Sequence, residues 1–131
     1  MIDHVSIAVR DLRTSGDFYE RLLAPLGYIR LVERPATVGF GRKYPELWLN
    51  ARPEMPALPS DTGAHLCLRA ADDEAVRAFH EAALAGGGAS AGEPGIRRAE
   101  RTAYYGAFIL DPDGNKLEAA AFPRKNPPDL S

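Results

Sequence analysis

The spacing of hydrophobic and polar residues predicts the same order of elements twice along the chain. Apolar and polar positions alternate over Ile2–Val9 and again over His65–Ala70, with the period of two that is typical of a strand. Each segment is followed by an aspartate that can cap a helix and by apolar residues at helical spacing, over 11–26 and 72–85. Strand-like segments then follow at 28–33, 37–41 and 46–51 in the first half and at 101–110 and 115–122 in the second, with a short strand expected near Ile96.

The two halves also match residue by residue when His4 is aligned with His65. The alignment then pairs Asp11 with Asp72, Phe18 with Phe79, Leu23 with Leu84 and Gly27 with Gly88. Such a repeat predicts an α+β fold in which two β-α-β-β-β modules, residues 1–52 and 63–122, form one domain over residues 1–122. The proline-rich segment between them is expected to be a linker, and residues 123–131 are expected to form an extended or disordered tail.

Length and composition fit a single globular domain, and the balance of charges limits the kinds of partner that it can bind. The chain has 131 residues, 45% of them hydrophobic, and its 16 basic residues nearly balance 18 acidic ones. This balance argues against nucleic acid as the main partner, and no segment approaches the roughly 20 apolar residues that cross a membrane. The lone cysteine, Cys67, cannot form an internal disulfide, and the first residues lack a signal-peptide pattern, so a cytoplasmic location is expected.

Two histidines and one glutamate are the candidate metal ligands. His4 and His65 stand at equivalent points of the two modules, and Glu118 lies between two apolar residues of the last strand. If helices cover the apolar faces of these strands, all three side chains point to the opposite, concave face. Two imidazole nitrogens and a carboxylate oxygen suit a divalent transition metal with open positions for substrate. A lone histidine in a strand is more often structural, and Glu118 could face water at an edge, so the residues alone leave both interpretations open.

Several segments resemble the vicinal oxygen chelate superfamily, which comprises glyoxalases, bleomycin resistance proteins and extradiol dioxygenases. The similar segments span residues 1–122 and are 2–12, 18–19, 24–28, 63–66 and, most specifically, 104–118, which reads YYGAFILDPDGNKLE. The resemblance implies a glyoxalase-like fold whose paired modules form a half-open barrel around one site. It also implies that His4, His65 and Glu118 hold a divalent ion, such as Zn, Ni, Mn or Fe(II), and that the protein is a homodimer.

The glyoxalase I branch of this superfamily uses a fourth protein ligand, which should come from the last strand of the first module. An ungapped match of 45–50 with 115–120 places Trp48 at that position, and Trp48 cannot bind a metal. Shifting this alignment by two residues would place Glu46 there instead, so a carboxylate as the fourth ligand stays an alternative. Three ligands do not favour isomerisation of a glutathione hemithioacetal, because a carboxylate near the fourth position also serves as the base for that reaction.

Three functions are compatible with these residues. The favoured one is a small metal-dependent enzyme of lyase or isomerase type, in which the ion stabilises an enolate or oxyanion of a small oxygenated substrate. One alternative is a non-catalytic, bleomycin-resistance-like binding protein, and another is a single-domain extradiol dioxygenase, against which the short chain counts. The candidates for contacting a small-molecule ligand are Trp48, Phe40, Tyr104, Tyr105 and Arg42. Strand alternation requires at least one of the two adjacent tyrosines to point away from the site.

Overall fold

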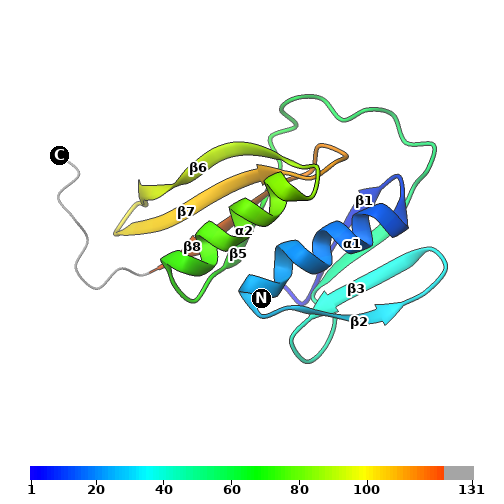
Figure 1. The fold of residues 1–131 in the computed structure, drawn as a ribbon, viewed down its shortest axis with the longest axis horizontal. Helices are drawn as coiled ribbons and strands as arrows, with labels where there is room; N and C mark the ends of the chain where they lie inside the picture. Colours follow the sequence, from blue (N-terminus) through cyan, green and yellow to red (C-terminus); the bar gives the residue numbers. More distant parts are fainter. Residues whose placement is uncertain (123–131) are drawn as a thin grey trace.

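The computed structural model describes residues 1–122, and each half of this part of the chain forms one module (Figure 1). The first module comprises β1 (Val5–Val9), α1 (Leu12–Leu23), the short 3-10 helix η1 (Ala24–Leu26), β2 (Ile29–Glu33), β3 (Thr37–Gly41) and β4 (Leu47–Ala51). The second comprises β5 (Leu66–Arg69), α2 (Asp73–Ala85), β6 (Ala89–Arg98), β7 (Ala103–Leu110) and β8 (Lys116–Ala121). The tail expected at 123–131 lies outside the described residues. None of the described helices has the length and apolar character needed to span a membrane.

Each module forms its own four-stranded sheet, and the two sheets have the same strand order. The order is β1-β4-β3-β2 in the first sheet and β5-β8-β7-β6 in the second. In both sheets the first strand pairs in parallel with the last, whereas the remaining pairs are antiparallel. The sequence repeat is therefore a repeat of structure, and the fold is the α+β arrangement of paired β-α-β-β-β modules, without a closed barrel.

Aspartates begin both helices, as their positions in the sequence predict. The Asp11 carboxylate accepts hydrogen bonds from the backbone N–H groups of Arg13 and Thr14, each at 3.1 Å. The Asp72 carboxylate accepts one from the Ala75 N–H at 2.8 Å. These bonds satisfy donors that the first turn of a helix leaves without a partner, so each helix begins directly after its parallel strand.

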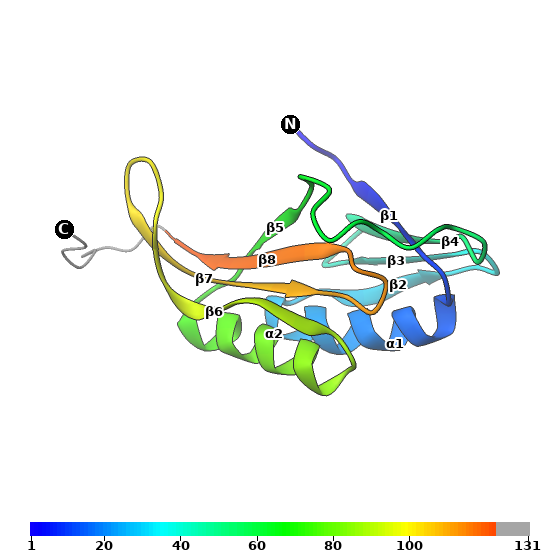
Figure 2. The same cartoon turned by 90° about the horizontal axis from the view of Figure 1, so that it is seen from above.

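Both helices pack against the same side of the two sheets (Figure 2). The fully buried side chains of this layer include Tyr19, Leu22, Leu23, Phe40, Leu47, Leu49, Val76, Phe79, Ile109 and Leu117. α1 and α2 contact one another, so the two modules lie side by side with their helices adjacent. Since no helix in the described part of the chain covers the other side of either sheet, we refer to these two surfaces as the open faces.

Polar contacts of the β7–β8 turn with α1 and β1 link the second module to the first. The buried Tyr19 hydroxyl donates a hydrogen bond to Asp111 Oδ2 at 2.7 Å, and the Asn115 side-chain amide donates to a backbone carbonyl of β1 at 2.9 Å. Burial raises the pKa of Asp111, while the hydrogen bonds from Tyr19 and Asn115 act in the opposite direction. The turn therefore positions β8, which carries Glu118, relative to the first module.

Strand β6 is longer than the sequence predicts. The sequence indicates only a short strand near Ile96, whereas the structure extends the strand over Ala89–Arg98, with register irregularities on both sides of Gly92. β6 is the outer strand of its sheet. An outer strand tolerates Pro94, which has no N–H, and the local bulges, because one of its edges has no partner strand to bond with.

Candidate functional site

The open face of the second sheet is organised around the Glu118 carboxylate. Glu118 follows the buried Leu117 in β8, and strand alternation turns its side chain away from the helices. Its Oε1 lies 3.3 Å from His65 Nε2, and its Oε2 accepts a hydrogen bond of 2.7 Å from the Tyr104 hydroxyl. The Glu118 side chain is only 6% exposed, whereas the His65 side chain is 42% exposed. The result is a buried carboxylate with partners on both oxygens and an imidazole that faces solvent.

A glycine makes room for this arrangement. A Cβ atom on Gly106 of β7 would lie 2.7 Å from the Tyr104 ring and 3.3 Å from Glu118 Oε2. The first distance is shorter than a van der Waals contact, so a larger residue would displace the tyrosine from the carboxylate. Gly106 therefore permits the hydrogen bond between Tyr104 and Glu118.

The acidic groups around Glu118 are held in their protonated forms. Three effects raise the pKa of Tyr104 to about 12. Desolvation is the largest, and the hydrogen bond to Glu118 and the negative charge of Glu118 add to it. Desolvation and then the Glu118 charge also raise the pKa of the Cys67 thiol to about 12. Because a thiol with such a pKa is almost entirely protonated at neutral pH, Cys67 is not an activated nucleophile.

The third sequence-predicted ligand, His4, belongs to the open face of the first sheet. It precedes β1 as His65 precedes β5, and its Nδ1 lies 2.8 Å from Asp3 Oδ2. A carboxylate on one ring nitrogen orients an imidazole and leaves the other nitrogen free to bind a metal. His4 lines a cavity of about 490 Å³, which we call the Trp48 pocket; its lining residues are Asp3, His4, Ser6, Arg34, Thr37, Tyr44, Pro45, Trp48 and Asn50.

The structure brings two of the three predicted ligands together and leaves the third on the neighbouring sheet. His65 and Glu118 form a close pair, but within residues 1–122 no group of three or more His, Cys, Asp or Glu side chains could hold one ion. The expectation that one chain directs all three to a single point is therefore not met. Ser6 lines both the Trp48 pocket and a smaller cavity of about 280 Å³ that reaches His65, so the two open faces adjoin along β1.

The strand register places Trp48 at the position that corresponds to Glu118. Glu118 is paired with Cys67 across the β5–β8 ladder, and Trp48 is paired with Ser6 across the β1–β4 ladder. Ser6 and Cys67 are equivalent in the repeat, being two residues beyond His4 and His65. The ungapped alignment is therefore the structural one. Glu46 lines a different cavity, beside Tyr28 and Arg42, and is not among the residues that line the Trp48 pocket with His4.

The other proposed ligand contacts divide between the two sides of the sheets. Tyr104 faces Glu118, and Trp48 lines the pocket beside His4. Phe40 is fully buried in the core, so its assignment to the cavity is wrong, because β3 turns this side chain toward α1. Tyr105 alternates with Tyr104 and packs against the core, with Arg77 of α2 over its ring.

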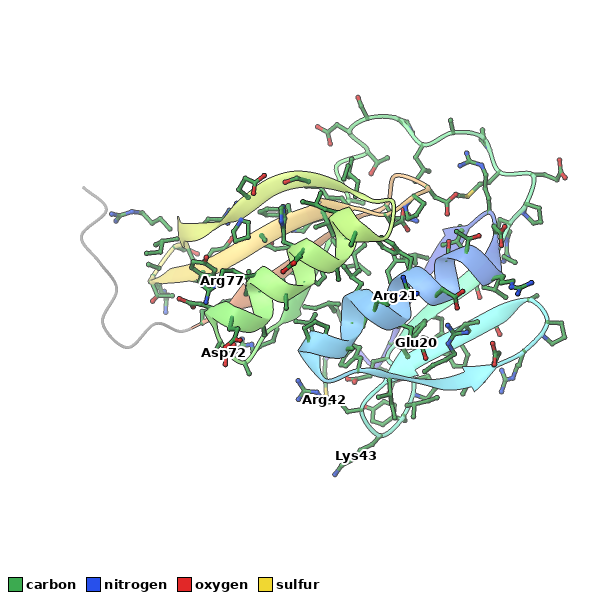
Figure 3. All side chains as sticks on the ribbon, in the orientation of Figure 1. Glu20, Arg21, Arg42, Lys43, Asp72 and Arg77 are labelled. Carbon is green, nitrogen blue, oxygen red and sulfur yellow. The ribbon has the colours of Figure 1, made fainter. Side chains whose placement is uncertain are left out.

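Arg42, a further proposed ligand contact, lies elsewhere. Its guanidinium donates to the Leu26 carbonyl at 3.1 Å and stacks on the Tyr28 ring, 5.9 Å from the ring centroid. Figure 3 shows Arg42 beyond the end of α1, where the chain leaves the helix. Arg42 therefore lies outside the Trp48 pocket, because the β3–β4 connection carries it to the end of η1, where it lines the small cavity that it shares with Glu46.

Seven of the nine residues that line the Trp48 pocket were not among the sequence-based candidates, and four of these are Asp3, Arg34, Thr37 and Asn50. Thr37 and Asn50 are cross-strand partners in β3 and β4. Asn50 lies two residues after Trp48 and so points to the same face of β4, a signal that could have identified it. Asp3 could have been recognised from its position directly before His4. Arg34 lies in the β2–β3 hairpin, where no periodicity indicates which way a side chain points.

A comparison with protein families finds one match. The family model described as the Glyoxalase/Bleomycin resistance protein/Dioxygenase superfamily matches residues 1–119. The comparison with curated proteins finds no match.

Solved structures share the fold. A glyoxalase/bleomycin resistance protein from Albidiferax ferrireducens T118 is 30% identical with a TM-score of 0.81, over 92% of this chain and 98% of that chain. A putative glyoxalase from Bacillus halodurans is 24% identical with a TM-score of 0.68, over 93% of this chain and 96% of that chain. A glyoxalase-related enzyme from Fulvimarina pelagi is 19% identical with a TM-score of 0.69, over 94% and 88% of the two chains. From the family match over most of its length, this chain belongs to the Glyoxalase/Bleomycin resistance protein/Dioxygenase superfamily.

Proposed function

We propose that the protein is a metal-dependent enzyme of lyase or isomerase type that acts on a small oxygenated molecule, with His4, His65 and Glu118 as the metal ligands. The observation that carries this proposal is the arrangement of Glu118, a buried carboxylate that has one oxygen beside His65 and the other held by Tyr104. A carboxylate in a sheet is costly to bury unless its oxygens are bonded, and an oriented carboxylate beside an exposed imidazole is a favourable start for a divalent metal site.

The donor set fits a metal when two copies of the chain are considered together. One chain supplies His65 and Glu118 on one open face and His4 on the other. In a homodimer in which the first open face of one copy meets the second open face of its partner, each of two equivalent sites would receive all three ligands. Asp3 supports this role for His4, because it engages Nδ1 and leaves Nε2 available. The bound ion would act as a Lewis acid toward an oxygen of the substrate.

The residues of the chain itself would orient the site and exclude water. Tyr104 holds Glu118 Oε2 and so keeps Oε1 directed toward the imidazole. Its raised pKa keeps the phenol protonated, and therefore a hydrogen-bond donor, throughout the physiological range. Two open faces brought together would enclose the small molecule between the sheets, which strengthens electrostatic interactions at the reacting oxygens.

Metal content of the purified protein tests the ligand assignment. We expect about one divalent ion per chain in the parent protein, as a symmetric dimer with two sites requires. The His65→Ala and Glu118→Gln variants should lose the ion, whereas Glu46→Gln, which removes the alternative fourth carboxylate, should keep it. Metal retained by Glu118→Gln, or a parent protein that does not bind divalent metal at all, would contradict the proposal.

Mixed dimers test whether the site is shared between copies. The His4→Ala and His65→Ala variants should each bind no metal alone. After unfolding and refolding together, dimers with one chain of each kind contain one complete site, provided that His4 comes from the other copy. Metal binding that returns on mixing supports the shared site, and no return at an equal dimer population contradicts it. The oligomeric state of each sample is measured by light scattering.

A second candidate function is ligand binding without catalysis. It is favoured by Trp48, an aromatic residue in the position that corresponds to the proposed metal ligand Glu118 of the other module. An indole ring at this point can stack on a flat molecule. Tight binding of aromatic ligands by a parent protein that does not take up metal would favour this function over the enzyme.

A further inference from the structure

We propose that the Trp48 pocket binds planar carboxylates, with Arg34 as the residue that recognises the acid group and Trp48 as the surface on which the ligand stacks. This names the substrate class of the site proposed above and to that extent rests on the proposed function. The pocket itself, however, lies within one chain and requires no metal. Its volume of about 490 Å³ falls in the range of roughly 300–1,000 Å³ that is typical of small-molecule sites.

Trp48 provides a fixed aromatic surface. Its ring lies over Gly39 of the neighbouring strand β3, where a Cβ atom would be only 3.0 Å from two ring carbons and from Pro45. The indole is therefore held close to the sheet on one side. Its other surface contributes to the pocket, and flat conjugated molecules bind such rings by offset stacking.

Arg34 provides the positive charge. Its guanidinium carbon lies 5.6 Å from the centroid of the Trp48 ring, so the charge lies close to the aromatic surface on which the ligand would stack. Within residues 1–122 the Arg34 side chain has no carboxylate partner, in contrast to Arg30, which contacts Asp17, Glu20 and Glu33. A guanidinium that stacks on an aromatic ring and lacks an ion-pair partner is suited to a bidentate contact with a planar carboxylate.

Uncharged polar groups complete the pocket. Thr37 and Asn50 face one another across the β3–β4 ladder, and both line the cavity. Thr37 Oγ1 is buried and has no hydrogen-bond partner among the described residues. An unused buried hydroxyl is unfavourable in a folded protein, and Thr37 and Asn50 together give this side of the cavity a polar character. Asp3, the one carboxylate in the lining, is engaged with His4 and 75% exposed, so solvent screens its charge from an incoming acid.

Fluorescence of the protein tests this proposal directly, because Trp48 is the single tryptophan of the chain. Benzoate and cinnamate are titrated into metal-free protein under tryptophan-selective excitation, and benzamide and cinnamamide serve as neutral molecules of the same shape. We expect saturable quenching by the two acids and at least about tenfold weaker binding of the amides, as the loss of a charged hydrogen-bonded pair predicts.

The Arg34→Gln variant should weaken binding of the acids by about tenfold or more and leave the amides unchanged. The matched control is Arg77→Gln, because Arg77 also stacks on an aromatic ring, 5.7 Å from the centroid of Tyr105, but lies on α2, outside the pocket (Figure 3). Circular dichroism and thermal unfolding establish that both variants are folded.

Equal affinity for acids and amides, undiminished acid binding by Arg34→Gln, or no saturable quenching by either acid would overturn the proposal. Metal content is measured on separate samples. Acid binding by a protein that fails to bind metal would leave the pocket assignment intact and contradict only the metal-dependent enzyme. Metal binding by a protein that fails to bind the acids would contradict only the pocket assignment and leave the metal-dependent enzyme intact.

Discussion

The Tyr104 hydroxyl donates a hydrogen bond of 2.7 Å to Glu118 Oε2 and thereby fixes the orientation of the carboxylate whose other oxygen lies beside His65. Tyr104 comes from β7 and Glu118 from β8, two antiparallel neighbours, so the pair links adjacent strands on the open face. This contact places Tyr104 in the site and leaves Tyr105 on the core side of the strand. The sequence alone could not tell which of the two adjacent tyrosines faces the site.

The Tyr104→Phe substitution should weaken metal binding without abolishing it. The hydroxyl does not itself bind the ion in the proposed site, but residues that orient ligands typically change metal affinity by about 10- to 100-fold. Competition with a chromophoric chelator measures the dissociation constant. Tyr105→Phe is the matched control, because it removes the same group from the core side of β7. A Tyr104→Phe protein with the parent's affinity would show that the hydrogen bond plays no part in positioning the carboxylate.

Asp111 should give the free energy of unfolding a pH dependence opposite in sign to that of most aspartates. Burial raises its pKa in the folded protein, so the folded state holds this proton more tightly than the unfolded state does. The stability that Asp111 contributes is therefore fully present below its unfolded pKa and is lost as the pH rises through its raised folded pKa.

Comparison of the parent protein with Asp111→Asn isolates this contribution. The variant should be less stable by about 1–3 kcal/mol, because the amide nitrogen that replaces Oδ2 cannot accept the hydrogen bond from the Asn115 side chain, which even a protonated carboxyl oxygen can accept. The destabilisation should be greatest in acid and should decrease as the pH rises through the raised pKa. Urea unfolding at several pH values measures it, and a deficit that grows with pH would contradict the assignment.

The Gly39→Ala substitution should displace Trp48 and weaken the proposed acid binding. Its Cβ would lie 3.0 Å from the indole ring and from Pro45, closer than such atoms normally approach. We expect a shift of the tryptophan emission and weaker quenching by benzoate. Gly95→Ala is the control, since its Cβ would meet only the Glu93 carbonyl at 3.9 Å. Unchanged emission and benzoate affinity in Gly39→Ala would show that the close contact does not hold the ring in place.

Much of the site was accessible from the sequence because strands alternate their side chains. The positions of Leu117 and Ala119 directed Glu118 to the open face, and the repeat identified His4 and His65 as equivalent residues. The same repeat placed Trp48 opposite Glu118, as the strand register confirms. Phe40 and Arg42 were misassigned because aromatic or charged character alone does not indicate which side of a sheet a residue faces.

The sequence by itself determined the two modules, their order of strands and helices, and the face to which each candidate ligand points. These properties follow from caps, turns and periodicities that act over a few residues. Only the tertiary structure decided that the two open faces lie side by side, so that His4 does not join His65 and Glu118 within one chain. That outcome depends on packing between α1 and α2 and on the bond between Tyr19 and Asp111, contacts between residues far apart in the sequence that no local pattern encodes.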